Sequence, residues 1–183
     1  NLMILKYLLL GLLIPFVSAK DYKAVDTLDL ESYMGKWYQV YGDNFDKLFQ
    51  KNGRCATAEY AILSSNNVSV HNEQISSSDK LETIDGYAFY KEGDSGGYLT
   101  VKLDGQGEAP YWVIELGPVT ENLYDYAIVS DNLKLSLFVL TRDVDNFYKY
   151  YNENVLQSLN EFGFTNKLNK PIEMSQNNCT VKN

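Results

Sequence analysis

The chain has 183 residues, of which 45% are hydrophobic, and a formal net charge of −8. This length suits one domain built around one hydrophobic core. The acidic balance argues against binding to nucleic acid or to an anionic membrane surface, so we expect neither as a partner.

The N-terminal segment has the pattern of a cleavable signal peptide. Lys6 precedes an apolar run from Leu8 to Val17, and Ser18 and Ala19 provide a cleavage site of small residues. The run is too short to span a bilayer, which disfavours the alternative of an uncleaved membrane anchor. We therefore expect residues 1–19 to be removed and residues 20–183 to form one secreted, extracellular domain without a membrane span.

The chain contains two cysteines, Cys55 and Cys179. An even number of cysteines in a secreted chain predicts a disulfide, here between an early strand and the C-terminal tail. The triplets that begin at Asn67 and Asn178 match the acceptor sequence for N-glycosylation. Asn67 falls in a predicted turn and is the better candidate, because a disulfide at Cys179 would crowd a glycan on Asn178.

Short segments rich in β-branched and aromatic residues recur at roughly ten-residue spacing, with turn residues between them. This pattern is typical of an all-β sandwich or barrel. The eight predicted strands are Lys36 to Tyr41, Arg54 to Leu63, Val68 to Ile75, Leu81 to Tyr90, Tyr98 to Leu103, Pro110 to Leu116, Leu123 to Asp131 and Leu135 to Thr141. An eight-stranded, up-and-down antiparallel β-barrel can enclose one small ligand.

After the last predicted strand, apolar residues recur at every third or fourth position. Phe147, Tyr151, Val155 and Phe162 belong to this pattern, which predicts one amphipathic α-helix. Gly163 is placed to end the helix in a left-handed conformation. We expect the apolar side of this C-terminal helix to pack on the outside of the barrel.

Alternation along the strands separates side chains that face the barrel interior from those that face outward. The small residues Ala58, Gly86 and Ala88 fall on candidate inner faces and would leave volume unfilled. Protein interiors are normally packed as densely as organic crystals, so either large side chains from other strands or a ligand must occupy that volume. Further inner-face candidates are Ala56, Tyr60, Ile62, Val68, Val70, Asn72, Gln74, Ile84, Leu99, Val101, Leu103, Phe138 and Leu140.

Three separated stretches resemble the signatures of the lipocalin family. Gly35-Lys36-Trp37-Tyr38 matches the G-x-W signature, Tyr124-Asp125-Tyr126 is similar to the second signature, and Leu140-Thr141-Arg142 is similar to the third. Their order fits the predicted strands, and the resemblance covers nearly all of the domain. The implied fold is the lipocalin calyx, an eight-stranded up-and-down antiparallel β-barrel with one C-terminal α-helix packed on the outside.

Within this family the chain is most similar to the branch of apolipoprotein D and the insect bilin-binding proteins. Lys51-Asn52-Gly53-Arg54-Cys55, Ala58-Glu59-Tyr60 and Ala109-Pro110-Tyr111-Trp112 carry this similarity. Members of the branch usually have two disulfides. Here only the bridge from the second strand to the tail can form, because the chain has no further cysteine.

The resemblance implies a carrier that binds a small hydrophobic ligand inside the barrel, such as a fatty acid, a sterol, a retinoid or a bilin pigment. Positions that match the cavity wall of this branch include Tyr60, Asn72, Gln74, Leu103 and Phe138. The amides of Asn72 and Gln74 are costly to bury unpaired, so a ligand, trapped water or Tyr60 must satisfy them. We expect no cofactor. The predicted ligand-binding residues are Ala58, Tyr60, Val70, Asn72, Gln74, Gly86, Ala88, Val101, Leu103, Tyr111, Phe138 and Leu140.

Trp37 and Arg142 are predicted to meet at the closed end of the barrel, where the indole face attracts the guanidinium. Gly35 would let the backbone turn tightly into this floor. The role of these residues is structural, so a ligand would enter from the opposite end. Gln39 and Tyr41 alternate in phase with Trp37 and are expected to line the interior above the floor.

Two other classes of function are alternatives. The single histidine, His71, is expected to face outward, so we expect neither a histidine-rich metal site nor a catalytic nucleophile–histidine–acid arrangement. A few lipocalins are thiol-dependent isomerases of lipid peroxides, and Cys55 would be the nucleophile of such an enzyme unless Cys179 pairs with it. The other alternative is an interaction protein whose loops contact a receptor; a homodimer is a further possible assembly.

Overall fold

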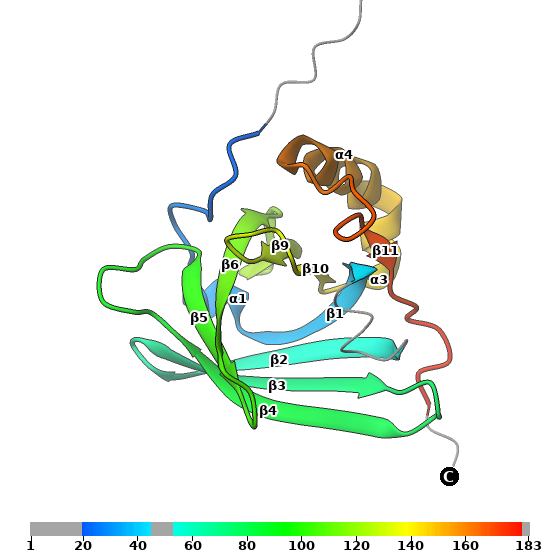
Figure 1. Ribbon diagram of the computed structural model, residues 1–183, viewed down its shortest axis with the longest axis horizontal. Coiled ribbons are helices and arrows are strands. Elements are labelled where there is room, and N and C mark those ends of the chain that lie inside the picture. Colours follow the sequence, from blue (N-terminus) through cyan, green and yellow to red (C-terminus); the bar gives the residue numbers. More distant parts are fainter. Residues whose placement is uncertain (1–19, 45–52, 181–183) are drawn as a thin grey trace, which may run out of the picture.

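The computed structural model describes residues 20–44 and 53–180, so the predicted signal peptide lies outside the described residues. The strands of the barrel are β1 Gly35–Gly42, β2 Arg54–Ser64, β3 Asn67–Ile75, β4 Leu81–Phe89, β5 Tyr98–Leu103, β6 Glu108–Leu116, β9 Tyr126–Ser130 and β10 Leu137–Thr141. They form one antiparallel sheet in the order β10-β9-β6-β5-β4-β3-β2-β1, and β1 pairs with β10 to close it (Figure 1). A closed eight-stranded barrel with a helix on its outside confirms the predicted fold class.

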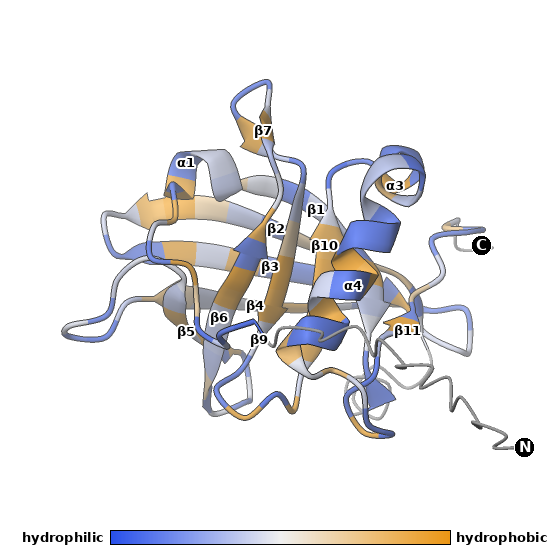
Figure 2. Ribbon diagram, turned by 90° about the horizontal axis from the view of Figure 1, so that it is seen from above, coloured by the Kyte–Doolittle hydropathy of each residue, from blue (hydrophilic) through white to orange (hydrophobic). Residues whose placement is uncertain are grey.

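The predicted strands coincide with the observed ones to within two residues at either end, with one exception. The predicted strand from Leu123 to Asp131 is wrong because the structure divides it at Asp125. Its first part, β8 (Leu123–Tyr124), forms a small hairpin with β7 (Val119–Thr120), which projects from one end of the barrel (Figure 2). The Asp125 carbonyl oxygen accepts a hydrogen bond from the Arg142 backbone N–H at 3.0 Å, which ties the chain down where it leaves the hairpin for β9.

The C-terminal helix differs from the continuous α-helix that the sequence predicts. It begins as α3 (Val144–Asn146), widens into the π-helical segment η1 (Phe147–Tyr151) and continues as α4 (Asn152–Phe162). Gly163 ends α4 with a φ of 89°, in the predicted left-handed conformation. Among residues 20–44 and 53–180, no helix has the length and apolar character needed to cross a membrane.

The apolar side of the helix packs on the outer wall of the barrel, as predicted. Val155, Leu159 and Phe162 are buried there. Their cluster includes Ile128 on β9 and Val139 on β10. Figure 2 shows α4 beside β10, with hydrophilic residues on its exposed side. This outer core is separate from the core inside the barrel.

Tyr41 belongs to the outer core and does not line the interior, so its predicted orientation is wrong. A β-bulge between Gln39 and Tyr41 interrupts the pairing of β1 with β10 and shifts the alternation by one residue. The Tyr41 ring lies 6.3 Å from the Phe147 ring, and its hydroxyl donates to Asn152 Oδ1 at 2.8 Å. Gln39, before the bulge, lies opposite Leu140 of the interior core.

The β11 strand (Ile172–Glu173) pairs with the end of β1, where the C-terminal tail begins its return along the barrel. A disulfide then joins Cys55 on β2 to Cys179 in the tail, with the two Cα atoms 5.6 Å apart, which confirms the predicted pairing. The tail is also held by hydrogen bonds, including one from the Cys55 N–H to the Ser175 carbonyl oxygen at 2.7 Å. Because its sulfur is bridged, Cys55 offers no thiolate for the isomerase chemistry considered above.

Candidate ligand-binding site

One end of the barrel is sealed by the start of β1, by the short helix α1 (Leu30–Tyr33) and by Arg142, which directly follows β10. Trp37 on β1 is fully buried, and the Arg142 guanidinium stacks on its indole with Cζ 3.6 Å from the ring centroid. Gly35 begins β1 with a φ of 89°, a conformation that favours glycine, and a Cβ there would lie 3.5 Å from Arg142 Nη1. The structure therefore brings the three predicted floor residues together.

Arg142 ties this floor to several backbone segments. Its Nη2 donates to the carbonyl oxygens of Tyr33 at 3.0 Å and Met34 at 2.6 Å, and its Nη1 donates to that of Lys36 at 2.7 Å. Hydrogen bonds from a charged donor are stronger than neutral ones. Burial lowers the pKa of Arg142 to about 10, so the side chain keeps its charge at neutral pH.

Three tyrosine hydroxyls meet inside the barrel next to the floor. The Tyr111 hydroxyl lies 2.7 Å from that of Tyr33 and 2.9 Å from that of Tyr60. The Tyr33 ring also lies 5.1 Å from the Trp37 ring, so the triad rests on the floor. Three hydroxyl protons serve two hydrogen bonds here, which leaves one proton for an acceptor inside the barrel.

Burial keeps this tyrosine triad un-ionised. It raises the pKa of Tyr60 to about 12 and raises the pKa values of Tyr33 and Tyr111 well above their ordinary value. The folded protein therefore holds phenolic protons at a pH where the unfolded chain releases them. The stabilising contribution is complete below about pH 10, where free tyrosine ionises, and is lost as the pH rises through the folded pKa.

We therefore expect the free energy of unfolding to fall as the pH rises from about 10 to about 12. The lowered pKa of Arg142 acts in the opposite direction, but one arginine is outweighed by three tyrosines. Phenolate absorbance and far-UV circular dichroism, followed in one alkaline titration, test this expectation. Exposed tyrosines should ionise first. The triad should ionise only when the β-sheet signal is lost. Full ionisation near pH 10 in an intact barrel would contradict the buried triad.

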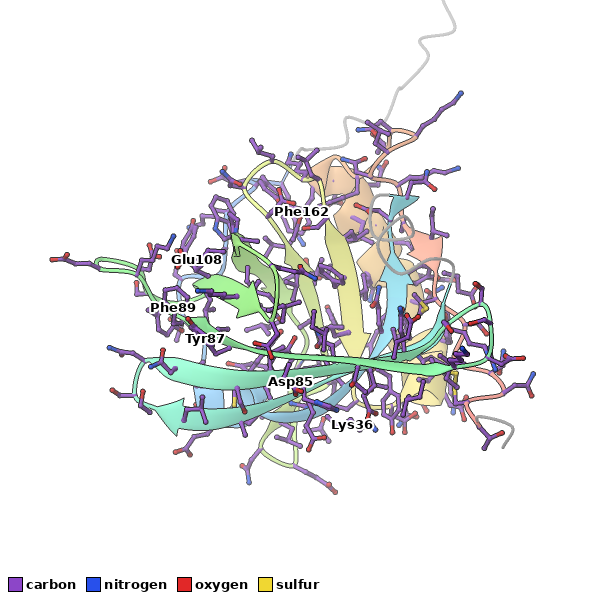
Figure 3. All side chains as sticks on the ribbon, turned by 60° about the horizontal axis from the view of Figure 1, so that its bottom comes forward. Lys36, Asp85, Tyr87, Phe89, Glu108 and Phe162 are labelled. Atoms are coloured by element: carbon purple, nitrogen blue, oxygen red, sulfur yellow. A yellow bond between two sulfur atoms is a disulfide. The ribbon has the colours of Figure 1, made fainter. Side chains whose placement is uncertain are left out.

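The strand register places the predicted ligand-binding residues on one inner wall. Val70 on β3 pairs with Tyr60 on β2 and Gly86 on β4, and Gly86 pairs with Leu103 on β5. Buried in the interior core are Ala58, Tyr60, Val70, Ala88 and Leu140, while Val101, Leu103, Tyr111 and Phe138 pack against it and stay partly exposed. The alternate residues of β4, Asp85, Tyr87 and Phe89, lie on the opposite face of the strand (Figure 3).

Gly86 has a packing reason to lack a side chain. A Cβ at this position would lie 2.3 Å from the Lys102 carbonyl oxygen and 2.8 Å from the Leu103 Cα. The backbones of β4 and β5 therefore approach too closely for any other residue. The absence of a side chain here allows the strands to pack and does not by itself create ligand space.

Polar side chains occupy the inner wall at the end opposite the floor, which we call the mouth. Gln74 on β3 and Glu82 on β4 are directly paired, and Gln74 Nε2 donates to Glu82 Oε2 at 2.9 Å. Among the described residues Gln74 Oε1 is buried without a hydrogen-bond partner. Asn72 lies on the same face, opposite Ala58. In the described part of the chain, no hydrogen bond joins either amide to the Tyr60 hydroxyl, which lies 2.9 Å from that of Tyr111.

Among the interior residues that the predicted set lacks, Glu82 and Tyr33 carry polar groups that matter for the site. Glu82 could have been found by alternation, because it lies two positions before the inner-face candidate Ile84. Tyr33 lies before the first strand, and it enters the interior because α1 crosses the end of the barrel. The strand pattern contains no signal for that crossing.

A separate hollow of about 570 Å³ lies at the floor end of the molecule. Its wall includes Leu28, Leu30 and Tyr90, together with the loop between β4 and β5. The Tyr90 hydroxyl already donates to the Gly96 carbonyl oxygen at 2.8 Å. Within the described part of the chain, this hollow offers no buried polar atom that lacks a partner, in contrast to the mouth.

A barrel with a sealed floor, an apolar inner wall and a few polar groups near the other end has the architecture of the calyx-type proteins. Residues 28–173 match the family model described as the lipocalin-like domain. The chain belongs to the lipocalin family.

Similar proteins support this assignment. The chain is 34% identical to the outer membrane lipoprotein Blc of Vibrio cholerae over 121 residues, which cover 66% of this chain and 68% of that protein. It is 28% identical to apolipoprotein D of Oryctolagus cuniculus over 90 residues, which cover 49% of this chain and 46% of that protein. The match to apolipoprotein D thus spans less than half of that relative, and it supports the resemblance to the apolipoprotein D branch. The solved structure of apocrustacyanin C1 superposes with a TM-score of 0.58 at 18% identity, covering 81% of this chain and 79% of that one, and shows the common fold.

Proposed function

We propose that the protein is a carrier that binds one small hydrophobic molecule inside the barrel. The observation that supports this most strongly is the contrast between the two ends of the inner wall. Trp37 and Tyr33 at the floor are buried, whereas Asn72, Leu103 and Phe138 on the same wall keep partial exposure. A ligand that enters at the mouth would cover this surface and come to rest on the tyrosine triad.

The driving force would be desolvation of the inner wall and of the ligand. Burial of apolar surface contributes about 25 cal/mol per Å², partly offset by the entropy lost on association. The small side chains of Ala58 and Ala88 occupy little of the interior, and Tyr111 and Phe138 provide aromatic surface. The spare proton of the triad could bind a carbonyl or hydroxyl oxygen of the ligand. A fatty acid, sterol, retinoid or bilin of suitable length fits this description.

Fluorescence titration with retinol, cholesterol, oleate and biliverdin tests the proposal. Trp37 lies directly below the interior, so a ligand bound there should change its emission, whereas Trp112 belongs to residues packed on the outer core. We expect a saturable change with one ligand per chain for at least one compound. A Trp112→Phe variant should keep the change and isolate the Trp37 signal. Failure of every compound to give a saturable change would count against the carrier function.

We further propose that the protein is secreted and that Asn67 carries an N-linked glycan. The signal-peptide pattern of residues 1–19 supports secretion, and so does a disulfide, which is typical of oxidising compartments. Asn67 is exposed at the start of β3, whereas Asn178 directly precedes the bridged Cys179. In protein secreted by a eukaryotic host, Asn67→Gln should remove the glycan mass and Asn178→Gln should leave it in place.

A further inference from the structure

We infer that the mouth of the barrel selects ligands whose polar end is a protonated amine. This inference rests on the proposed function, because it concerns a ligand held in the same interior. The observation behind it is the pair Gln74 and Glu82. Their geometry and charge favour a hydrogen-bond donor group of the ligand that is positively charged.

The register of β3 and β4 orients both side chains toward the interior. Val70 pairs with Gly86, and Val70 belongs to the interior core. Because side chains alternate along a strand, the residues four positions beyond Val70 and four positions before Gly86 lie on the same face. These residues are Gln74 and Glu82, and they pair with each other. Both are partly exposed, as expected for the rim of an open cup.

The hydrogen bond between them fixes the orientation of the amide. Gln74 Nε2 donates to Glu82 Oε2 at 2.9 Å, and the reversed amide would place two acceptor oxygens against each other. Gln74 Oε1 is therefore turned away from the carboxylate, buried, and without a hydrogen-bond partner in the described part of the chain. Native proteins pair nearly all buried polar atoms, so this oxygen lacks a donor that a ligand could supply.

The charge at the mouth points to the same kind of ligand. Glu82 forms no ion pair with any residue in the ranges 20–44 and 53–180; the acidic residues that do are Asp26, Asp79, Asp85, Glu73, Glu108 and Glu115. The Arg142 guanidinium lies at the opposite end of the barrel and donates to backbone carbonyls. Glu82 and Gln74 Oε1 thus have no described cation bound to them, and Arg54, which pairs with Ile75 beside Gln74, forms its ion pair with Asp79.

An alkylammonium group matches this arrangement. It has three N–H donors, enough for Glu82 and Gln74 Oε1 together, and its hydrogen bonds to the carboxylate are strengthened by charge. A neutral hydroxyl offers one donor and no charge. A carboxylate offers only acceptors and would be repelled by Glu82. The expected order of affinity for one alkyl chain is therefore amine, then alcohol, then acid.

Laurylamine, lauryl alcohol and laurate test this order, because they share one alkyl chain and differ only in the polar end. Each would displace the neutral fluorescent lipophile phenylnaphthylamine at neutral pH, below the concentration at which micelles form. We expect the amine to bind about ten- to a hundredfold more tightly than the alcohol, as for a hydrogen bond to a charged group. Laurate should bind more weakly than the alcohol.

Glu82→Gln should lower the affinity for the amine far more than the affinity for the alcohol, so that most of the preference for the amine is lost. Glu73→Gln is the matched control, since Glu73 lies between Asn72 and Gln74 on the outer face of β3, where it contacts His71, and its replacement changes the net charge equally. Gln74→Leu, which removes the unpaired acceptor, should also weaken amine binding. Thermal unfolding would establish that each variant is folded.

The outcomes separate the inference from the function on which it rests. If the alcohol binds and the amine binds no more tightly, the inference is overturned while the carrier function stands, and the same holds if laurate binds best. Equal losses of amine affinity in Glu73→Gln and Glu82→Gln would assign the effect to net charge and would also overturn it. If neither the fluorescent lipophile nor any of the three compounds binds, the carrier function itself fails.

Discussion

Arg142→Ala is expected to lower the free energy of unfolding by about 3 kcal/mol, at the upper end of what single substitutions usually cost, because it removes several hydrogen bonds from one charged donor. The truncation leaves the carbonyl oxygens of Tyr33 and Met34, whose hydrogen bonds are partly buried, and the more exposed oxygen of Lys36 without their donor. It also removes the cation above the Trp37 indole, worth roughly 0.5 to 2 kcal/mol. Equilibrium unfolding in urea would measure the loss.

Two substitutions define how specific this effect is. Arg142→Lys keeps the charge but replaces the planar set of donors by one ammonium group, so it should recover only part of the stability. Arg54→Ala removes the chain's other arginine, whose ion pair with Asp79 is largely exposed, and should cost less than about 1 kcal/mol. A loss of stability below about 1 kcal/mol for Arg142→Ala would contradict the structural role of Arg142 at the floor. So would a Trp37→Ala variant that keeps its stability but no longer binds ligand.

Removing the disulfide should cost about 4 to 5 kcal/mol, because it closes a loop with a sequence separation of 124 residues. In the loop-entropy account this stabilisation comes from restricting the unfolded chain. A single domain has only about 5 to 15 kcal/mol of stability in total, so the double variant Cys55→Ser, Cys179→Ser should be marginally stable. Urea unfolding of the variant, compared with the oxidised protein, would measure the difference.

The tail provides an internal control for the disulfide. The Gln176 side chain donates to the carbonyl oxygens of Gln39 at 2.7 Å and Ala56 at 2.9 Å, so the tail should stay docked in the folded variant. Proteolysis of the tail under native conditions would then be little faster than in the oxidised protein. A stability loss below about 1 kcal/mol would mean that the unfolded state is already compact, contrary to the loop-entropy account.

The barrel could be predicted from the sequence because its signals are local. Short β-rich segments separated by turn residues located the barrel strands, the change of period located the C-terminal helix, and Gly163 marked its end. The pairing of Cys55 with Cys179 required only a count of cysteines. The G-x-W stretch and the arginine after the last strand likewise pointed to the floor.

Predictions went wrong where one residue changes the phase of an element. The bulge after Gln39 moves Tyr41 from the inner to the outer core, and alternation alone gives no warning of a bulge. Asp125 interrupts a segment that looks continuous, because its carbonyl oxygen accepts a hydrogen bond from the N–H of Arg142, the residue after β10. The π-helical segment Phe147–Tyr151 likewise interrupts an element that the sequence predicts to be one continuous α-helix.

At the mouth, contacts between side chains on neighbouring strands could not be predicted, although the strands themselves were. Gln74 was in the predicted set, but its hydrogen bond to Glu82 and its unpaired oxygen depend on the register between β3 and β4. Sequence alternation gives the face of each residue and not its partner across the sheet. The chemical character of the site therefore emerges only when neighbouring strands are aligned.

The central claim, that a ligand binds inside the barrel, is tested most directly by a pair of substitutions on β4. Ile84 faces the interior opposite Asn72, whereas its neighbour Thr83 faces outward and is exposed. Ile84→Trp would fill the interior near the mouth, and Thr83→Trp would add the same indole to the outer surface. Titration of both folded variants with whichever compound binds the unaltered protein should show at least about tenfold weaker binding for Ile84→Trp, a difference of 1.4 kcal/mol, and unchanged affinity for Thr83→Trp. Equal affinities in the two variants would contradict the claim and place the ligand outside the barrel.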